Sequence, residues 1–245
     1  MKKKILFVFG TRPEAIKVAP VIKKFQNSNF DIKVCNTGQH SDLLDPVLGF
    51  FNIKPDFNLK VMKENQTLFD ITSNILSSLK TTLETYKPDL VFVHGDTTTA
   101  FISSLACFYL KIKIAHIEAG LRTKDKYSPF PEEMNRTLIS SLADFHFAPT
   151  KRSKSNLLDL KIPEQRIKIT GNTVIDSLLM AKEIVLKDSN YQINGVDNNK
   201  KIILFTGHRR ENFGTGFEKI FKSLKKISKN YPDIQIVYPV HPNPN

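Results

Sequence analysis

Apolar and polar residues alternate along the chain in blocks that predict strands followed by helices. Short, nearly continuous apolar runs predict strands at 5–10, 31–38, 89–95, 112–118, 145–150 and 166–171. The segments between them have helical spacing and predict helices at Glu14–Gln26, Asp42–Phe51, Leu68–Tyr86, Thr98–Tyr109, Glu132–Ala143 and Ser153–Leu160. Strands that are apolar on both faces and alternate with helices are typical of a parallel sheet covered on both sides. We therefore expect a doubly wound α/β domain over residues 1–170.

The pattern changes after residue 170. Residues 171–186 predict a helix capped by Asn172 or Thr173, and the polar tract that follows has the composition of a loop. A strand–helix–strand pattern then returns, at 201–208, Phe217–Lys229 and 234–241.

Two strands and one helix cannot cover both faces of a parallel sheet. The expected domains are therefore 1–170, a connecting helix and linker at 171–199, and the start of a second Rossmann-like domain at 200–245. The predicted fold class is α/β with two Rossmann-like doubly wound domains, of which the second is incomplete.

Composition narrows the choice of partners. The chain has 245 residues, 40% of them hydrophobic, which is enough to bury a sizeable core. Its net charge of +12 first suggests nucleic acid. The lysines are scattered, however, and no nucleic-acid-binding motif or aromatic-rich basic patch accompanies them, so we expect no nucleic-acid partner. A partly basic cleft for a phosphorylated ligand fits the charge equally well.

The sequence lacks the signals of several other classes of protein. Cys35 and Cys107 lie far apart in apolar stretches, as expected for buried thiols in a reducing cytoplasm. No apolar run approaches the roughly 20 residues that span a bilayer, and the apolar start has no cleavage site. Metal-ligand spacings such as CxxC or HExxH are absent from the sequence. We expect a cytoplasmic protein without a membrane segment or a metal ion.

The motif GTRPEAIK follows the first predicted strand. Gly10 permits a tight turn, and Pro13 suits the first turn of a helix. Exposed backbone N–H groups there, with Arg12 and Lys17 nearby, would form an anion site. The spacing GxGxxG is absent, so a dinucleotide is not indicated, and an ordinary strand-to-helix turn remains the alternative.

Two further strands each end in an acidic residue. Asp96 in HGDTTTA and Glu118 in HIEAGLR follow strands whose carboxyl ends would face a ligand in a doubly wound sheet. The alternatives are structural: Asp96 or Thr97 could cap the next helix, and Glu118 could pair with Arg122. The histidines inside these strands, His94 and His116, are expected to be packed in the core.

The motif SPFPEEMNR predicts a helix start with Glu132 and Glu133 in its first turn, where the helix dipole favours carboxylates. Glu132 would also pair at i,i+4 with Arg136, and simple capping is the alternative. In the second domain, GHRREN places His208 and Arg209 after a strand. This combination suits a diphosphate or a leaving oxygen, with a basic loop as the alternative.

Together these motifs resemble the non-hydrolysing UDP-N-acetylglucosamine 2-epimerases, in the order GTRPEAIK, GDTTTA, HIEAGLR, SPFPEEMNRT, ITGNTVIDSLL and TGHRREN. The resemblance runs from Ile5 to Pro242. It implies the glycosyltransferase-B architecture, with the sugar nucleotide between two Rossmann-like domains. It also implies interconversion of UDP-N-acetylglucosamine and UDP-N-acetylmannosamine, through loss and return of UDP and of the C2 proton.

The same resemblance implies roles for particular residues and no cofactor. Asp96, Glu118, Glu132 and His208 would be catalytic, and substrate would contact Arg12, Lys17, Asp96, Glu118 and His208. A second UDP-N-acetylglucosamine, acting as an activator, would contact Gln39, Gln66, Glu132, Arg209 and His241. Two positions depart from that activator pattern, Asp42 and Asn65, and Asn65 removes a cationic donor.

The resemblance further implies a UDP-sugar as substrate and a homodimer. Members of the family continue well past the end of this chain, so a complementing C-terminal chain is a further expected partner. Three other functions stay open: an inactive or weakly active fragment that binds a sugar nucleotide or a partner chain, a hydrolysing epimerase, and a glycosyltransferase of the same fold.

Overall fold

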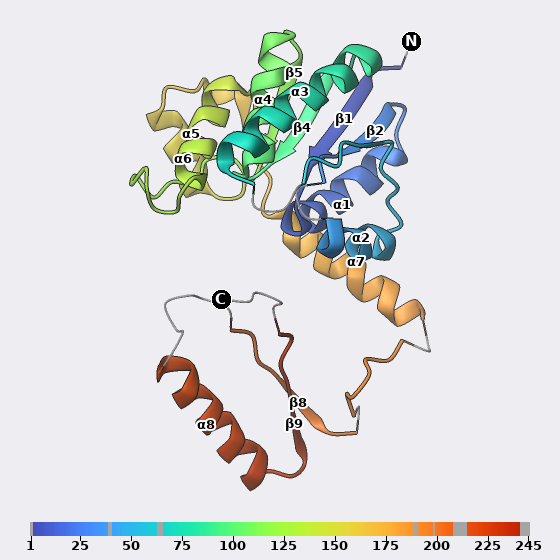
Figure 1. Ribbon diagram of the computed structural model, residues 1–245, viewed down its shortest axis with the longest axis vertical. Coiled ribbons are helices and arrows are strands. Elements are labelled where there is room, and N and C mark those ends of the chain that lie inside the picture. The colour runs from blue at the N-terminus through green and yellow to red at the C-terminus, as the bar shows by residue number, and fades with distance from the viewer. Residues whose placement is uncertain are drawn as a thin grey trace. The chain divides into compact units, whose positions relative to one another are not determined.

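Two compact units, Met1–Ile184 and Val185–Asn245, make up the chain (Figure 1). The structure is a computed structural model that describes residues 2–38, 41–62, 66–188, 191–197, 199–207 and 215–240. The first unit carries most of the predicted site.

The first unit is built on one parallel sheet. Its strands are β1 (Lys4–Phe9), β2 (Asp31–Asn36), β3 (Phe57–Asn58), β4 (Leu90–His94), β5 (Lys113–Ile117), β6 (Phe145–Ala148) and β7 (Ile167–Ile169). The seven strands lie in the order β3-β2-β1-β4-β5-β6-β7, and each neighbouring pair is parallel. The predicted doubly wound parallel sheet is confirmed. Strand β3 was not predicted, because two residues paired to an edge give no apolar run.

Helices cover both faces of this sheet. They are α1 (Arg12–Gln26), α2 (Ser41–Phe50), α3 (Leu68–Tyr86), α4 (Thr98–Tyr109), α5 (Glu132–Leu142), α6 (Lys151–Asp159) and α7 (Thr173–Lys187), with a 3-10 turn at Glu164–Arg166. Alternation along β1 sends Ile5, Phe7 and Phe9 into the core beneath α1, α2 and α7. Leu6 and Val8 enter the core beneath α3, α4 and α5. Figure 1 shows α3, α4 and α5 on one side of the sheet and α1, α2 and α7 on the other.

Threonines begin several of these helices. The side chains of Thr67, Thr97 and Thr150 each accept a hydrogen bond from the backbone N–H three residues later. Such caps satisfy N–H groups that the first helical turn leaves without partners. The cap at Thr97 bears on the site, because it leaves the neighbouring carboxylate of Asp96 free for other contacts.

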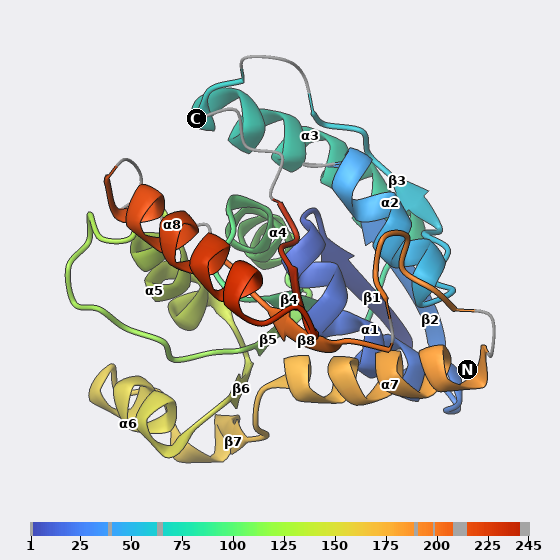
Figure 2. The same cartoon turned by 90° about the horizontal axis from the view of Figure 1, so that it is seen from below.

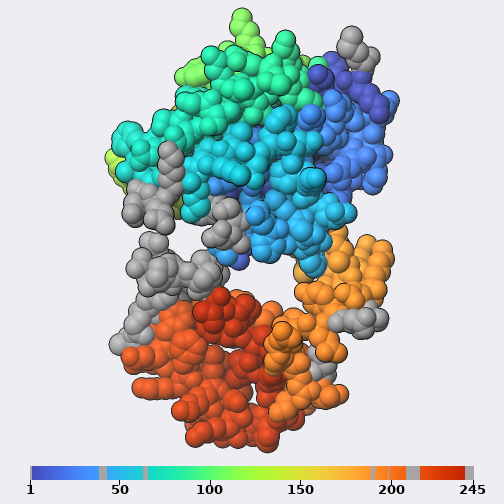
Figure 3. Space-filling model, turned by 45° about the vertical axis from the view of Figure 1, so that its right-hand side comes forward, coloured from blue at the N-terminus to red at the C-terminus, as the bar shows by residue number. Residues whose placement is uncertain are grey.

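Helix α7 belongs to the first unit along most of its length, beside α1 (Figure 2). The Asn172 side chain accepts from the N–H of Val174 at 3.0 Å, so Asn172 supplies the predicted cap. Met180 and Ile184 pack on the core beneath α1. An apolar hollow of about 400 Å³ lies between α1, α2 and α7. Figure 3 shows the gold surface of α7 against the blue surface around α2.

The second unit is small. Strands β8 (Lys201–Leu204) and β9 (Ile234–Val237) pair in parallel, and helix α8 (Thr215–Asn230) connects them. Phe205, Phe221 and Tyr238 form its aromatic cluster, with ring centroids 4.9 Å apart for Phe205 and Tyr238. Leu204 nevertheless stays 65% exposed, so this unit leaves apolar sheet surface uncovered by the described residues.

Both cysteines are buried and free, as predicted. Burial raises the pKa of the Cys35 thiol to about 12, which makes it unreactive near neutral pH. Among the described residues, no helix has the length and apolar character that crossing a membrane requires.

Gly120 yields a direct test of this packing. Its φ is +90°, and a Cβ there would lie 2.2 Å from the carbonyl oxygen of Ser153 in α6. We expect Gly120→Ala to lower the free energy of unfolding by roughly 2–5 kcal/mol, from left-handed strain plus overpacking. Urea denaturation measures this change.

Gly171→Ala is the matched control. Gly171 has φ +79°, but no described atom lies within 4 Å of its added Cβ. Gly171→Ala should lower the free energy of unfolding by the backbone strain alone, about 1–2 kcal/mol. Equal losses for the two variants would contradict the close approach at Gly120.

Candidate active site

The predicted acids meet at the carboxyl edge of the sheet. Asp96 follows β4, Glu118 follows β5 and Glu132 begins α5. The charges of Glu132 and Glu118 both act on Asp96, so the three carboxyl groups share one neighbourhood. Because β4 and β5 are parallel neighbours, their carboxyl ends open on the same edge, as predicted.

Glu118 is held by two polar side chains from other elements. The Lys17 ammonium of α1 donates to both its oxygens, at 2.8 and 2.7 Å. The amide of Asn172, before α7, donates at 2.9 Å. The alternative of a Glu118–Arg122 pair is wrong, because the Arg122 guanidinium donates to Leu121 O and to Ser140 Oγ.

The backbone of Glu118 is unusual. Its φ is +63°, in the left-handed region that costs a non-glycine residue about 1–2 kcal/mol. Such strain persists where surrounding contacts enforce it, and it concentrates at functional sites. In this conformation the Glu118 carboxylate contacts Lys17 and Asn172.

Asp96 lies in a different environment. Its carboxylate accepts from Arg136 Nη1 at 3.3 Å, and its main-chain carbonyl accepts from the Asn135 side chain at 2.9 Å. Burial raises the pKa of Asp96, and the charge of Arg136 opposes that shift. Since Thr97 caps α4, the alternative in which Asp96 is the cap is not what the structure shows.

The neighbouring acids Glu132 and Glu133 have separate roles in the structure. Glu133 is buried, and its carboxylate accepts from the backbone N–H groups of Thr123 and Lys124, both at 3.0 Å. Burial acts to raise the pKa of Glu133, but these hydrogen bonds and the charge of Arg136 lower it overall. Glu132 is half-buried, and among the described residues its Oε2 has no hydrogen-bond partner.

The predicted i,i+4 pair of Glu132 with Arg136 is therefore wrong. Arg136 pairs instead with Glu133 at i,i+3, where Nη2 lies 2.6 Å from Oε2, and with Asp96. Arg136 pairs with Glu133 rather than with Glu132 because the Glu133 carboxylate is buried and requires a cation. Glu132 is left with a buried oxygen that has no hydrogen-bond partner among the described residues.

Glu14 is a structural residue of the site that the sequence analysis did not identify. It is 2% exposed and accepts from Gly10 N, Thr11 N and Thr11 Oγ1 through one oxygen, at 3.0, 2.8 and 2.8 Å. Its other oxygen accepts from Thr97 Oγ1 at 2.7 Å. Glu14 thus joins the turn after β1 to the turn after β4. The spacing Thr11-x-x-Glu14 of a capping box was the signal that could have revealed it.

This arrangement corrects the predicted anion site. The N–H groups of Gly10 and Thr11 point to Glu14, and the Lys17 ammonium points to Glu118. Arg12 is half-buried at the start of α1 and has no polar partner among the described residues. Of the groups predicted to hold an anion at this turn, Arg12 is the one whose side chain contacts no polar group among the described residues.

The regulatory set is mostly outside the described residues. Gln39, Asn65, His208, Arg209 and His241 all lie there, as does the side chain of Asp42. Gln66 is described, and its side chain donates to the carbonyl of Val61 at 2.8 Å. Of the five residues predicted for the activator, the structure therefore describes Gln66 and Glu132.

Three buried histidines lie on adjacent strands behind the acids. His94 and His116 are 3% and 0% exposed, which confirms their prediction as core residues, and His146 on β6 is 1% exposed. His116 and His146 are register partners. Burial lowers the pKa of His94 and of His116 to about 3, and that of His146 to about 4. These imidazoles are neutral near pH 7, so they add no charge to the site.

The site contains oxygen and nitrogen groups suited to proton transfer and to binding an anion. No cluster of three His, Cys, Asp or Glu that could hold a metal ion occurs in the described part of the chain. One partly buried acid with a raised pKa, Asp96, lies beside a second acid, Glu118, that is paired with a lysine. Neighbouring carboxyl groups in contrasting environments can divide the roles of proton donor and acceptor.

Comparisons with known proteins agree on one family. A family model described as UDP-N-acetylglucosamine 2-epimerase matches residues 23–245. A UDP-N-acetylglucosamine 2-epimerase of Campylobacter jejuni is 53% identical over 255 residues, covering 100% of this chain and 67% of that protein. One of Escherichia coli K12 is 52% identical, covering 99% of this chain and 66% of that protein.

Solved structures agree as well. The crystal structure of the enzyme from Neisseria meningitidis bound to UDP-GlcNAc has 52% sequence identity and a TM-score of 0.86, covering 98% of this chain and 67% of that chain. This chain thus spans about two thirds of the length of the relatives it matches. The glycosyltransferase-B type of α/β fold, with its second domain incomplete, is confirmed by these structural neighbours.

The buried histidines make stability depend on pH. Below about pH 6.5 an unfolded histidine binds a proton, whereas these folded ones stay neutral until about pH 3 to 4. The unfolded state then binds more protons, so the free energy of unfolding falls as the pH drops from 6.5 toward 4, by up to about 1.4 kcal/mol per pH unit for each histidine. Urea denaturation at several pH values measures this slope.

His146→Phe removes one of the three histidines that bind a proton in the unfolded state but not in the folded state. The variant should lose stability less steeply on acidification, by up to about 1.4 kcal/mol per pH unit. A slope equal to that of the wild type would show that His146 does not contribute to the pH dependence of the free energy of unfolding.

Proposed function

This chain belongs to the UDP-N-acetylglucosamine 2-epimerase family, and we propose that it interconverts UDP-N-acetylglucosamine and UDP-N-acetylmannosamine. The observation that carries the proposal is the convergence of Asp96, Glu118 and Glu132 at the carboxyl edge of the sheet, with Lys17 bound to Glu118. The N. meningitidis relative is described as bound to UDP-GlcNAc, which supports a UDP-sugar as the ligand.

The chemistry fits these groups. A carboxylate takes the C2 proton while the C1–O bond to UDP breaks, and a double bond forms between C1 and C2. A carboxyl group on the other face then returns a proton to C2 as UDP re-adds at C1. Asp96, Glu118 and Glu132 are the acid and base candidates, and general acid–base catalysis by such groups contributes typically 10²–10⁴-fold each. The transfer consumes no redox equivalent.

A departing diphosphate needs cations. Arg12, at the N-terminal end of α1, has a half-buried guanidinium without a polar partner among the described residues, which supports a role in holding it. We assign the same role to Lys17 and to His208, which also belongs to the catalytic set. Lys17 would have to share its ammonium between Glu118 and the diphosphate, since both carboxylate oxygens of Glu118 now hold it.

We also propose a regulatory site for a second UDP-sugar, formed by Gln39, Gln66, Glu132, Arg209 and His241. Support comes from the described position of Glu132 beside Asp96, and from its unpartnered Oε2. Asn65 lacks the charge of an arginine, which would weaken the binding of the activator.

The oligomer that we propose is a homodimer in the cytoplasm. Phe108 and Tyr109, at the end of α4, are 58% and 63% exposed, with ring centroids 6.3 Å apart. Beside them, Leu76, Ala106 and Leu110 line a hollow of about 250 Å³ between α3 and α4. Exposed aromatic pairs of this kind are enriched at protein interfaces. The two reduced, buried cysteines support the cytoplasmic location.

A second candidate is an inactive or weakly active protein that binds a sugar nucleotide or a complementing chain. The uncovered apolar surface of two elements favours it. On α7, Ile175 and Leu178 are 58% and 66% exposed, and in the second unit Ile202 and Leu204 are 47% and 65% exposed. Contiguous exposed apolar residues often mark an interaction surface.

Proton exchange at C2 tests the function. In deuterated water, the chain with UDP-N-acetylglucosamine should incorporate deuterium at C2 and keep UDP attached. Asp96→Asn, Glu118→Gln and Glu132→Gln should each slow exchange by roughly 10²–10⁴-fold, because each removes a proton-transfer group. Mass spectrometry and proton NMR measure exchange.

Glu164→Gln is the control for these variants. Glu164 lies on a 3-10 turn, its side chain is 69% exposed, and it pairs with Lys154. Glu164→Gln should therefore exchange the C2 proton at the wild-type rate. Binding of UDP-N-acetylglucosamine without exchange would favour the inactive candidate. Release of free UDP would instead indicate a hydrolysing epimerase, and transfer of the sugar to an acceptor would indicate a glycosyltransferase.

Sedimentation equilibrium tests the dimer. The wild type should sediment as a dimer, and the double variant Phe108→Ser, Tyr109→Ser as a monomer, since it removes the apolar contact. Leu158→Ser on α6, where Leu158 is 38% exposed, should remain a dimer. A dimeric double variant would exclude this surface as the interface.

A further inference from the structure

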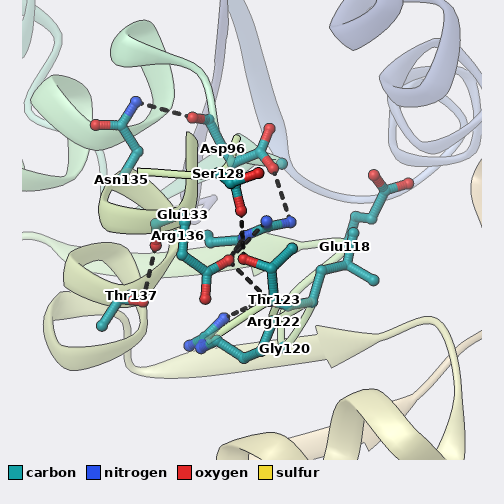
Figure 4. A network of polar contacts seen from close by, with 12 residues as sticks. Asp96, Glu118, Gly120, Arg122, Thr123, Ser128, Glu133, Asn135, Arg136 and Thr137 are labelled. Carbon is teal, nitrogen blue, oxygen red and sulfur yellow. Dashed lines mark hydrogen bonds and ion pairs between the residues drawn. The ribbon is translucent and has the colours of Figure 1, made fainter. Parts of the chain in front are cut away.

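Arg136 on α5 lies between two carboxylates (Figure 4). Its Nη1 donates to Asp96 Oδ2 at 3.3 Å, and its Nε donates to Glu133 Oε2 at 2.7 Å. The residue is 7% exposed, so this guanidinium is nearly removed from water. A buried guanidinium needs paired charges, and here it has one on each side.

Glu133 fixes the guanidinium in place. It is 3% exposed, and the N–H groups of Thr123 and Lys124 hold its oxygens from the opposite side. Two nitrogens of Arg136, Nε and Nη2, contact the same oxygen of Glu133. Because the guanidinium is planar, fixing Nε and Nη2 also fixes the direction of Nη1, which points to Asp96.

Helix α5 holds Asp96 at a second point. The Asn135 side chain donates to the main-chain carbonyl of Asp96 at 2.9 Å. One helix thus positions both the backbone and the carboxylate of Asp96. The segment that carries Glu133 and Arg136 also begins with Glu132, the third acid of the site.

We propose that Arg136, fixed by Glu133, is a positioning residue that orients the Asp96 carboxyl group and sets the pH at which it exchanges a proton with C2. This inference rests on the proposed function. It adds two positioning residues to the site: Arg136 acts through the Asp96 carboxyl group, and Glu133 acts through Arg136.

The charged groups around Asp96 support this role. Arg136 and Glu132 face it from α5, Glu118 from the end of β5, and Lys17 from α1. Burial raises the pKa of Asp96, and Arg136 is the strongest of the charges that lower it. Since Glu133 shares the charge of Arg136, the charge of Arg136 only partly offsets the burial of Asp96. Its carboxyl group therefore keeps its proton to a higher pH than an exposed aspartate does, and it can accept the C2 proton only above that pH.

Carbon-13 NMR of the Asp96 carboxyl group in the full chain tests the proposal without requiring activity. Removing Arg136 alone would leave Glu133 buried and unpaired, so the informative variant is the double substitution Glu133→Gln, Arg136→Gln. An opposite charge at this distance lowers a carboxyl pKa by about 1 unit or more. We expect the pKa of Asp96 to rise by about that amount in the double variant, and by less in Arg136→Lys.

Arg122→Lys is the matched control. Arg122 lies in the same network, but its guanidinium donates to Leu121 O and Ser140 Oγ rather than to Asp96. The titration of Asp96 in Arg122→Lys should equal that of the wild type. An unchanged titration in the double variant, or an equal shift in Arg122→Lys, would overturn the proposal.

The pH profile of C2 exchange supplies the second measurement. In Arg136→Lys we expect kcat to fall roughly 10–100-fold with little change in KM, and the acid limb of the profile to move to higher pH. A shifted NMR titration with an unshifted acid limb would show that Asp96 does not limit exchange, and would also overturn the proposal. If the wild type shows no exchange, the proposed function fails. The NMR result then decides alone whether Arg136 controls Asp96.

Discussion

The parallel pairing of β1 with β4 is the constraint on which the rest of the site depends. The strand order reverses at this pair, so the turns that follow β1 and β4 leave the same edge of the sheet in adjoining positions. The buried carboxylate of Glu14 then joins the two turns through four hydrogen bonds. A buried carboxylate is costly unless it is fully hydrogen-bonded, so these contacts act together and hold the turns rigidly.

Environment, rather than residue type, divides the work among five carboxylates. Glu14 and Glu133 are almost fully buried and receive backbone N–H groups, as structural acids do. Asp96, Glu118 and Glu132 keep part of their surface and face one another at the strand ends. In our proposal the first pair builds the walls of the site, and the other three exchange protons with the sugar.

The two units contrast in how well they cover their own sheets. The first has helices on both faces and two large apolar clusters. In the described part of the second unit, two strands and one helix are present, and the residues of β8 remain exposed. The chain spans about two thirds of the length of the relatives it matches.

The sequence by itself determined the alternation of strands and helices, the parallel sheet, and the position of Asp96, Glu118 and Glu132 at its carboxyl edge. It could do so because apolar periodicity and strand ends are local properties of the chain. Only the tertiary structure decided which carboxylate each cation binds. Lys17 reaches Glu118 across 101 positions, and Arg136 turns to Glu133 and Asp96 instead of Glu132. Such pairings follow from burial and from the distance between elements, and spacing along one helix does not encode either of these.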